Sequence, residues 1–164
     1  MQGARTHHSS SAHQLISQNI EFLLLQYVRA TGCGQVLHAP VDVVLGEGSR
    51  RDVVQPDIVF IAATRTAIVT KQEIAGAPDL VIEILSPGTA DRDRGYKRTL
   101  YQRTSVREYW IVDPDQMSID TFCLGPTGFT APLRYRHDDE IVCTAIPGLR
   151  VSLVEVFKTW GATP

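Results

Sequence analysis

Residues 79–85 read Asp-Leu-Val-Ile-Glu-Ile-Leu, and this segment constrains the fold more than any other part of the chain. A short run of apolar and β-branched residues bounded by turn residues is typical of a buried central strand. Two further runs of this kind, residues 56–61 and 108–113, predict more strands of the same sheet. A sheet built from such strands is expected to be flanked by helices, because its apolar faces must be covered.

Helical patterns before and after these strands agree with this expectation. Apolar residues at three-to-four spacing predict a first helix over Leu15–Val28, which Ser10 or Ser11 can begin and Gly32 can end. The order of elements indicates an α/β (α+β) domain with a mixed central β-sheet flanked by helices. The other predicted helices span residues 90–103 and 152–160, and the other predicted strands lie within residues 36–45, 118–124, 129–135 and 141–144.

Length and composition fit one globular domain. The chain has 164 residues, which at roughly 150 residues per domain predicts a single domain. We expect residues 1–12 to form a mobile polar tail and residues 13–160 to form the domain. The net charge of -2 shows no global excess of basic residues, so any surface that binds nucleic acid must be local.

The cysteines and the lengths of the apolar runs bear on the cellular location. Cys33, Cys123 and Cys143 lie far apart and form neither a CxxC pair nor an even set, which is typical of reduced thiols in a cytoplasmic protein. No apolar run approaches the ~20 residues of a membrane-spanning helix. We therefore expect a cytoplasmic protein without a membrane partner.

Two carboxylates interrupt strands that otherwise have the pattern of buried strands. Asp57 follows Pro56 at the start of one strand, and Glu83 lies between two isoleucines in another. Burial of a carboxylate is costly unless it is paired or binds a metal. Two acids on adjacent strands match the oxygen ligands that Mg²⁺ prefers. A structural alternative stays open, in which Glu83 pairs with an arginine or lies near a strand end in solvent.

The predicted helix over residues 90–103 adds a cation next to these acids. Asp93, Lys97 and Tyr101 share one helical face at i, i+4 and i+8, just after the strand that contains Glu83. A lysine in this place can orient a water or neutralise the charge of a phosphate. The same helix is the most basic stretch of the chain, and its candidates for contacts to a DNA backbone are Arg92, Arg94 and Arg98.

Two polar residues of the first predicted helix, His13 and Glu21, lie on or near its apolar stripe. A polar residue in such a place is more often solvated than functional. We therefore interpret both as solvated positions.

The order Pro56-Asp57, Glu83 and then a lysine resembles the PD-(D/E)XK arrangement of nucleases. In the usual motif the lysine lies two residues after the acid on the same strand, and here that position is Leu85. Lys97 would have to serve from the following helix instead.

A longer pattern extends over most of the chain, from about residue 13 to residue 157. It comprises Pro56-Asp-Ile-Val, Gly76-Ala-Pro-Asp-Leu-Val-Ile-Glu-Ile-Leu-Ser-Pro-Gly-Thr89, then Asp93, Lys97, Tyr101, Val106-Arg-Glu-Tyr-Trp-Ile-Val-Asp-Pro114 and Pro147-Gly-Leu-Arg-Val-Ser-Leu153. This pattern resembles the Uma2 (Uma-two) family of restriction endonucleases, which implies a restriction-endonuclease-like core of the PD-(D/E)XK superfamily. By position, the resemblance implies that Asp57, Glu83 and Lys97 are the active-site residues.

The resemblance implies a metal-dependent endonuclease that hydrolyses DNA phosphodiester bonds. Asp57, Glu83 and the backbone carbonyl of Ile84 would hold Mg²⁺ or Mn²⁺. Lys97 would position the attacking water, and the neighbouring Asp93 and Tyr101 would orient Lys97. An RNA or nucleotide phosphodiesterase would use the same site chemistry.

A second interpretation is a catalytically weak or inactive nuclease-fold module for DNA binding or oligomeric assembly. Two features motivate it: Leu85 replaces the strand lysine, and the chain begins after the extra helix and acidic hairpin usual in the family. Cleavage of both strands of a duplex usually takes two sites, so we expect a homodimer. Tyr109, Trp110 or the hairpin beyond them would form its interface.

Overall fold

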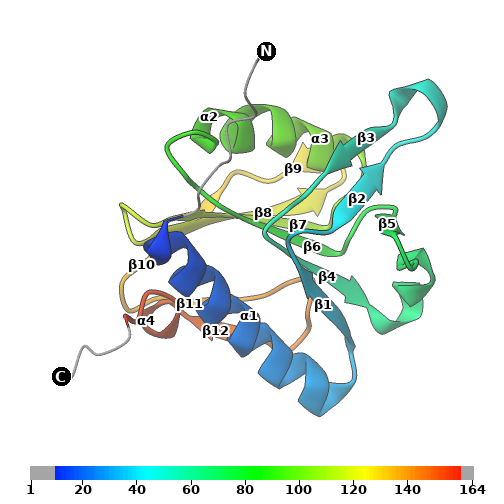
Figure 1. Cartoon of the computed structure of the whole chain (residues 1–164). Helices are drawn as coiled ribbons and strands as arrows, with labels where there is room; N and C mark the ends of the chain where they lie inside the picture. Colours follow the sequence, from blue (N-terminus) through cyan, green and yellow to red (C-terminus); the bar gives the residue numbers. More distant parts are fainter. Residues whose placement is uncertain (1–9, 160–164) are drawn as a thin grey trace.

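A mixed β-sheet of seven strands forms the centre of the computed structural model, which describes residues 10–159 (Figure 1). Strands β6 and β7 are parallel, and the other neighbours are antiparallel. The predicted α/β (α+β) class with a mixed sheet is confirmed. In spatial order the strands are β1 (Gly34–His38), β4 (Ile58–Ala62), β6 (Leu80–Ile84), β7 (Glu108–Asp113), β8 (Ser118–Gly125) and β10 (Leu133–Arg136), with β9 (Gly128–Phe129) paired to β8.

Layers pack on both faces of this sheet (Figure 1). One face is covered by α1 (Ser11–Thr31), the hairpin of β11 (Glu140–Val142) and β12 (Arg150–Ser152), and α4 (Leu153–Val156). The other face is covered by α2 (Ala90–Arg92), the π-helical segment η3 (Asp93–Lys97), α3 (Arg98–Arg103) and a small sheet of β3 (Asp52–Val54), β2 (Asp42–Leu45) and β5 (Glu73–Ala75). Short 3-10 helices η1 (Gly48–Arg50) and η2 (Ala63–Ile68) connect the strands.

The central strand β6 is buried along its whole length, which explains its continuous apolar sequence. Side chains alternate between the faces of a strand. Leu80 and Ile82 therefore belong to the core beneath α1, whereas Val81 belongs to the core beneath α3. This alternation places Glu83 on the α3 side of the sheet.

The first predicted helix is confirmed as α1. The side chain of Ser10 accepts a hydrogen bond from the His13 amide at the start of the helix, and Gly32 ends it in a left-handed conformation at φ 67°. The helix begins at Ser11, so residues 11 and 12 are helical and not part of a tail as predicted. Residues 1–9 of the predicted tail lie outside the described residues.

Three other predicted elements differ from the structure. The helix predicted over residues 90–103 contains the π-helical segment η3. The strand region predicted within residues 36–45 is divided into β1 and β2, which belong to different sheets. The predicted final helix ends at Val156, and its expected end at residue 160 lies outside the described residues.

The predicted dimer interface at Tyr109 and Trp110 is wrong. Both side chains are completely buried in the core of their own chain, because β7 is an interior strand that is covered on both faces. They cannot contact a second copy of the folded chain. The homodimer itself stays a prediction, as does the cytoplasmic location.

None of the helices within residues 10–159 is long and apolar enough to cross a membrane. Cys33, Cys123 and Cys143 all lie in this range, and no disulfide joins them.

Gly34 is expected to tolerate no side chain. A Cβ atom at this position would collide with the backbone oxygen of Ile61 and lie 2.5 Å from the ring of Phe60. Gly34→Ala should therefore lower the free energy of unfolding by about 1–3 kcal/mol, as overpacking does. Gly95→Ala is the control, since a Cβ atom there meets nothing within 4 Å. Urea unfolding of both variants measures the difference, and equal stabilities would contradict the prediction.

Candidate active site

The two predicted carboxylates lie opposite each other, just beyond the paired residues of β4 and β6. Ile58 is paired with Ile82 in antiparallel register, so the next pair in this register is Asp57 and Glu83. Opposed residues point to the same face of a sheet. The Oδ2 atom of Asp57 accepts a hydrogen bond of 2.7 Å from the amide of Ile84. The structure thus brings both acids to one end of the sheet.

Glu83 is held in a buried ion-pair cluster. Its Oε1 atom accepts a hydrogen bond of 2.6 Å from the Tyr101 hydroxyl and lies 2.9 Å from Lys97 Nζ. Lys97 Nζ also lies 2.9 Å from Asp93 Oδ1. The predicted alternative for Glu83 is therefore wrong, because its partner is a lysine and the residue is only 2% exposed. The structure brings Glu83, Lys97, Asp93 and Tyr101 together, and their roles stay predictions.

The π-helical segment η3 contributes two residues of this cluster, Asp93 and Lys97. The backbone oxygen of Asp93 accepts a hydrogen bond of 3.0 Å from the buried Tyr109 hydroxyl, which ties η3 to β7. Single π-helical turns are rare and frequently occur at functional sites. This hydrogen bond thus fixes the start of the segment whose last residue, Lys97, presents its ammonium group to Glu83.

The cluster has more negative than positive groups, with the carboxyls of Asp57, Glu83 and Asp93 near the single ammonium of Lys97. Burial, with repulsion from Asp57 and Asp93, raises the pKa of Glu83 to about 7, although Lys97 and the Tyr101 hydrogen bond oppose the shift. Burial disfavours the charged form of Lys97, but its two carboxylate partners outweigh burial and raise its pKa. Burial and the adjacent Glu83 raise the pKa of Tyr101 well above its ordinary value, so Tyr101 acts as a hydrogen-bond donor.

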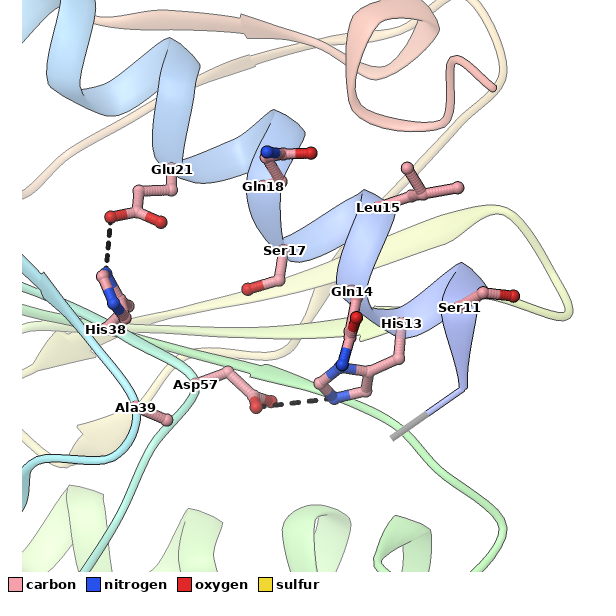
Figure 2. Close-up of a pocket in the computed structure, with 10 residues that line it drawn as sticks. All are labelled: Ser11, His13, Gln14, Leu15, Ser17, Gln18, Glu21, His38, Ala39 and Asp57. Atoms are coloured by element: carbon pink, nitrogen blue, oxygen red, sulfur yellow. Dashed lines mark hydrogen bonds and ion pairs between the residues drawn. The ribbon is translucent and has the colours of Figure 1, made fainter. Parts of the chain in front are cut away.

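His13 belongs to this site, and its interpretation as a solvated residue is wrong. Its Nε2 atom lies 3.4 Å from Asp57 Oδ1, and its side chain is 14% exposed (Figure 2). The hydrogen bond to Asp57 raises the pKa of His13, with further contributions from the Ile84 carbonyl and the Glu83 carboxyl, while burial lowers it. The sequence holds no signal for this contact, because a lone histidine on a helix has no characteristic spacing to an acid on a distant strand.

Glu21 is also not simply solvated. Its Oε1 atom lies 2.6 Å from Nδ1 of His38, a residue of β1 (Figure 2). This pair lies two turns along α1 from His13. Two histidine–carboxylate pairs therefore lie along α1, His13 with Asp57 and His38 with Glu21.

The three candidate arginines have different surroundings. Arg94 is 3.0 Å from Asp113 and 3.5 Å from Asp120, so it is engaged in ion pairs within the chain. Arg92 and Arg98 are exposed. The guanidinium of Arg92 lies beside the ring of Tyr96, and that of Arg98 beside Phe122. Contacts from these arginines to a DNA backbone stay a prediction.

The ligands predicted for a metal ion near Asp57 are all oxygen atoms. Within residues 10–159 no three His, Cys, Asp or Glu side chains form a group that could hold a metal ion. The predicted donor set is smaller: the carboxylates of Asp57 and Glu83 and the backbone carbonyl of Ile84. Mg²⁺ is often bound by one or two carboxylates while it keeps several waters. The excess of carboxyls over ammonium groups in the cluster is what a divalent cation would neutralise.

Comparison with known proteins identifies the family. Residues 6–154 match the model of the Uma2 family, which is described as "putative restriction endonuclease". The chain belongs to the Uma2 family. This assignment confirms the resemblance found in the sequence motifs, and it supports a nuclease function. No curated protein is significantly similar to the chain.

A solved structure shares the fold of this Uma2 chain. It is described as a putative nuclease belonging to DUF820 from Anabaena variabilis. The two are 19% identical in sequence, the match covers 91% of this chain and 82% of the other, and the TM-score is 0.74. At this level of identity the similarity shows a common fold.

The Uma2 chain differs from the usual PD-(D/E)XK pattern at Leu85. This side chain is 8% exposed and belongs to the core beneath α3. It contributes no charge to the site. Among the described residues, Lys97 is the cation that contacts Glu83, and it comes from the helical segment after the strand.

Proposed function

We propose that the chain is an endonuclease that hydrolyses phosphodiester bonds of DNA with the help of Mg²⁺ or Mn²⁺. The observation that carries this proposal is the buried cluster in which Glu83, opposite Asp57, is paired with Lys97. Ionisable groups with strongly shifted pKa values and specific charge partners concentrate at functional sites. The Uma2 assignment supports the same class of reaction.

The acids and one backbone oxygen form the proposed metal site. Asp57, Glu83 and the carbonyl of Ile84 would hold the ion, which when bound would polarise the scissile phosphate and lower the pKa of a water. The amide of Ile84 and the imidazole of His13 hold the Asp57 carboxylate in place. Fixed donors of this kind are what a metal site requires around its direct ligands.

Lys97 is the proposed residue for positioning the water. An ammonium group has three N–H donors, and the two carboxylate oxygens that lie 2.9 Å from Lys97 Nζ, one of Glu83 and one of Asp93, can take up at most two of them. The third donor can hold a water or a phosphate oxygen next to the cluster. Tyr101 and Asp93 act as positioning residues, since Tyr101 holds the Glu83 carboxyl and Asp93 holds the ammonium. The exposed Arg92 and Arg98 are proposed to contact the DNA backbone.

A plasmid-nicking assay with Asp57→Asn tests the proposal. Wild-type protein is expected to nick supercoiled DNA with Mg²⁺ or Mn²⁺ and to stop when the ion is chelated. Asparagine can still accept the hydrogen bond from Ile84 but lacks the charge, so nicking should fall by about 100-fold or more. Asp91→Asn is the matched control, because Asp91 is exposed on α2. Equal nicking by wild type and Asp57→Asn would contradict the proposal.

Metal-dependent stability separates this function from a nuclease-fold module. At an ion concentration about 100 times the dissociation constant, binding stabilises the folded state by about 2.7 kcal/mol. We expect Mn²⁺ to raise the melting temperature of wild type but not of Asp57→Asn. DNA binding without nicking and without a metal effect would favour the inactive binding or assembly module.

A further inference from the structure

A groove of about 660 Å³ extends along α1 from the Asp57 carboxylate (Figure 2). His13 and Asp57 form one end of it, and Glu21 and His38 form the other. A helix rises about 1.5 Å per residue, so the distance from His13 to Glu21 along α1 is about 12 Å. The groove therefore starts at the proposed reaction site and has room for part of a substrate strand.

The wall that α1 gives to this groove is polar except for Leu15, and its ionisable groups are His13 and Glu21. Gln14, Ser17 and Gln18 line it between the two ends. Their spacing of three and four residues puts them on one helical face with Glu21. No lysine or arginine is among the residues that line the groove, all of which belong to the described part of the chain. Its carboxylates are Asp57 and Glu21, and a histidine lies against each.

This chemistry suits a nucleobase better than a phosphate. Proteins hold phosphates mainly with arginine, lysine and backbone N–H groups, whereas the two imidazoles of this groove are each already paired with a carboxylate. Amide side chains are suited to base edges, since glutamine can pair with adenine through two hydrogen bonds. A carboxylate can accept a hydrogen bond from the amino group of cytosine. The volume of the groove is also within the range of small-molecule sites, about 300–1,000 Å³.

We propose that this groove binds one unpaired nucleobase of the DNA strand, next to the phosphodiester bond that the Asp57 site would cleave. Gln18 hydrogen-bonds the edge of the base, and the imidazole of His38 lies at the far end, where it can stack on the base. The groove favours adenine, cytosine or guanine over thymine, because these three bases have an exocyclic amino group that can donate to its acceptors. The inference rests on the proposed function and narrows its substrate, because a base stacked inside a duplex cannot enter a groove of this kind.

Binding without cleavage tests the inference. Labelled DNA duplexes, one fully paired and four with a single unpaired A, C, G or T, are titrated with the full chain, with Ca²⁺ in place of Mg²⁺, and followed by fluorescence anisotropy. Unpaired adenine, cytosine or guanine should increase the affinity about 5- to 150-fold over the paired duplex, which corresponds to 1–3 kcal/mol, and unpaired thymine should increase it less. Gln18→Ala should abolish this preference. The control Gln26→Ala should keep it, because Gln26 is an exposed glutamine of the same helix outside the groove.

Three results would overturn the inference while the nicking assay still supports the proposed function. The first is equal affinity for paired and unpaired duplexes. The second is an unchanged preference in Gln18→Ala, and the third is the same loss of preference in Gln26→Ala. Failure to bind any duplex contradicts the proposed function and the inference together.

Discussion

Replacement of Lys97 by methionine is expected to reduce Mg²⁺-dependent nicking by about 100-fold or more. The ammonium of Lys97 lies 2.9 Å from both Glu83 Oε1 and Asp93 Oδ1, and the side chain is 11% exposed. Methionine keeps most of the length and the apolar stem of the side chain. It offers no N–H group to orient a water and no charge to neutralise a phosphate. Plasmid nicking at a fixed Mg²⁺ concentration measures the loss.

The same substitution is expected to destabilise the fold, because it leaves two buried carboxyls without their cation. Removal of one partner of a buried ion pair costs about 3–5 kcal/mol. Burial raises the pKa of Glu83 to about 7 even beside Lys97, and loss of the lysine raises this pKa further, so at lower pH Glu83 can take up a proton and avoid part of this cost. The loss of unfolding free energy in Lys97→Met should therefore be smaller at pH 6 than at pH 8. Urea unfolding at both pH values measures it.

A double variant tests the structural role of Lys97 by its stability. Lys97→Met combined with Glu83→Gln removes one charge of each sign, so it should recover part of the stability of the single variant. It should not recover nicking. Lys71→Met is the control, since Lys71 is exposed outside the cluster, and its stability should stay within about 0.5 kcal/mol of wild type. Wild-type nicking by Lys97→Met would show that Lys97 has no part in catalysis.

The arrangement of the cluster could be predicted from the sequence because its contacts follow simple periodicities. Alternation along a strand predicts that Glu83 lies on one face of β6. Helical spacing predicts that Asp93, Lys97 and Tyr101 share one face of the helix that follows. The observed distances of 2.6–2.9 Å agree with both periodicities. The π-helical turn did not disturb this agreement, although nothing in the apolar pattern of residues 90–103 indicated it.

Contacts between distant elements could not be predicted in this way. His13 reaches Asp57 only because α1 packs across the sheet next to the start of β4, and no local pattern records that packing. The predicted interface at Tyr109 and Trp110 is a second case. Their burial depends on the position of β7 between β6 and β8, and that order is a property of the whole chain.

The stability of the chain is expected to fall as the pH rises toward 7, because of Glu83. Burial, with the repulsion from Asp57 and Asp93, raises the pKa of this residue from 4.5 to about 7 in the folded state. Between these values the folded chain keeps a proton that the unfolded chain has already lost, so the unfolding free energy decreases with pH. The contribution is fully present below pH 4.5 and is lost above pH 7. The shift corresponds to about 3 kcal/mol at most.

Glu83→Gln isolates this contribution. The amide does not titrate, so the unfolding free energy of the variant should vary less than that of wild type between pH 5 and pH 8. His13 has a raised pKa too and gives a slope of the same sign. It is present in both proteins, so its effect largely cancels in the difference. Parallel pH profiles for the two proteins would show that Glu83 titrates normally.

The proton on Glu83 also links metal binding to pH. A cation that is held by Glu83 must displace this proton, so its apparent affinity increases as the pH passes 7. The rise in melting temperature with Mg²⁺ should therefore be larger at pH 8 than at pH 6 in wild type. In Glu83→Gln that pH dependence should largely disappear, because the amide has no proton to release. A metal effect that is equal at both pH values in wild type would mean that the ion does not compete with the Glu83 proton, and the donor set would then have to exclude Glu83.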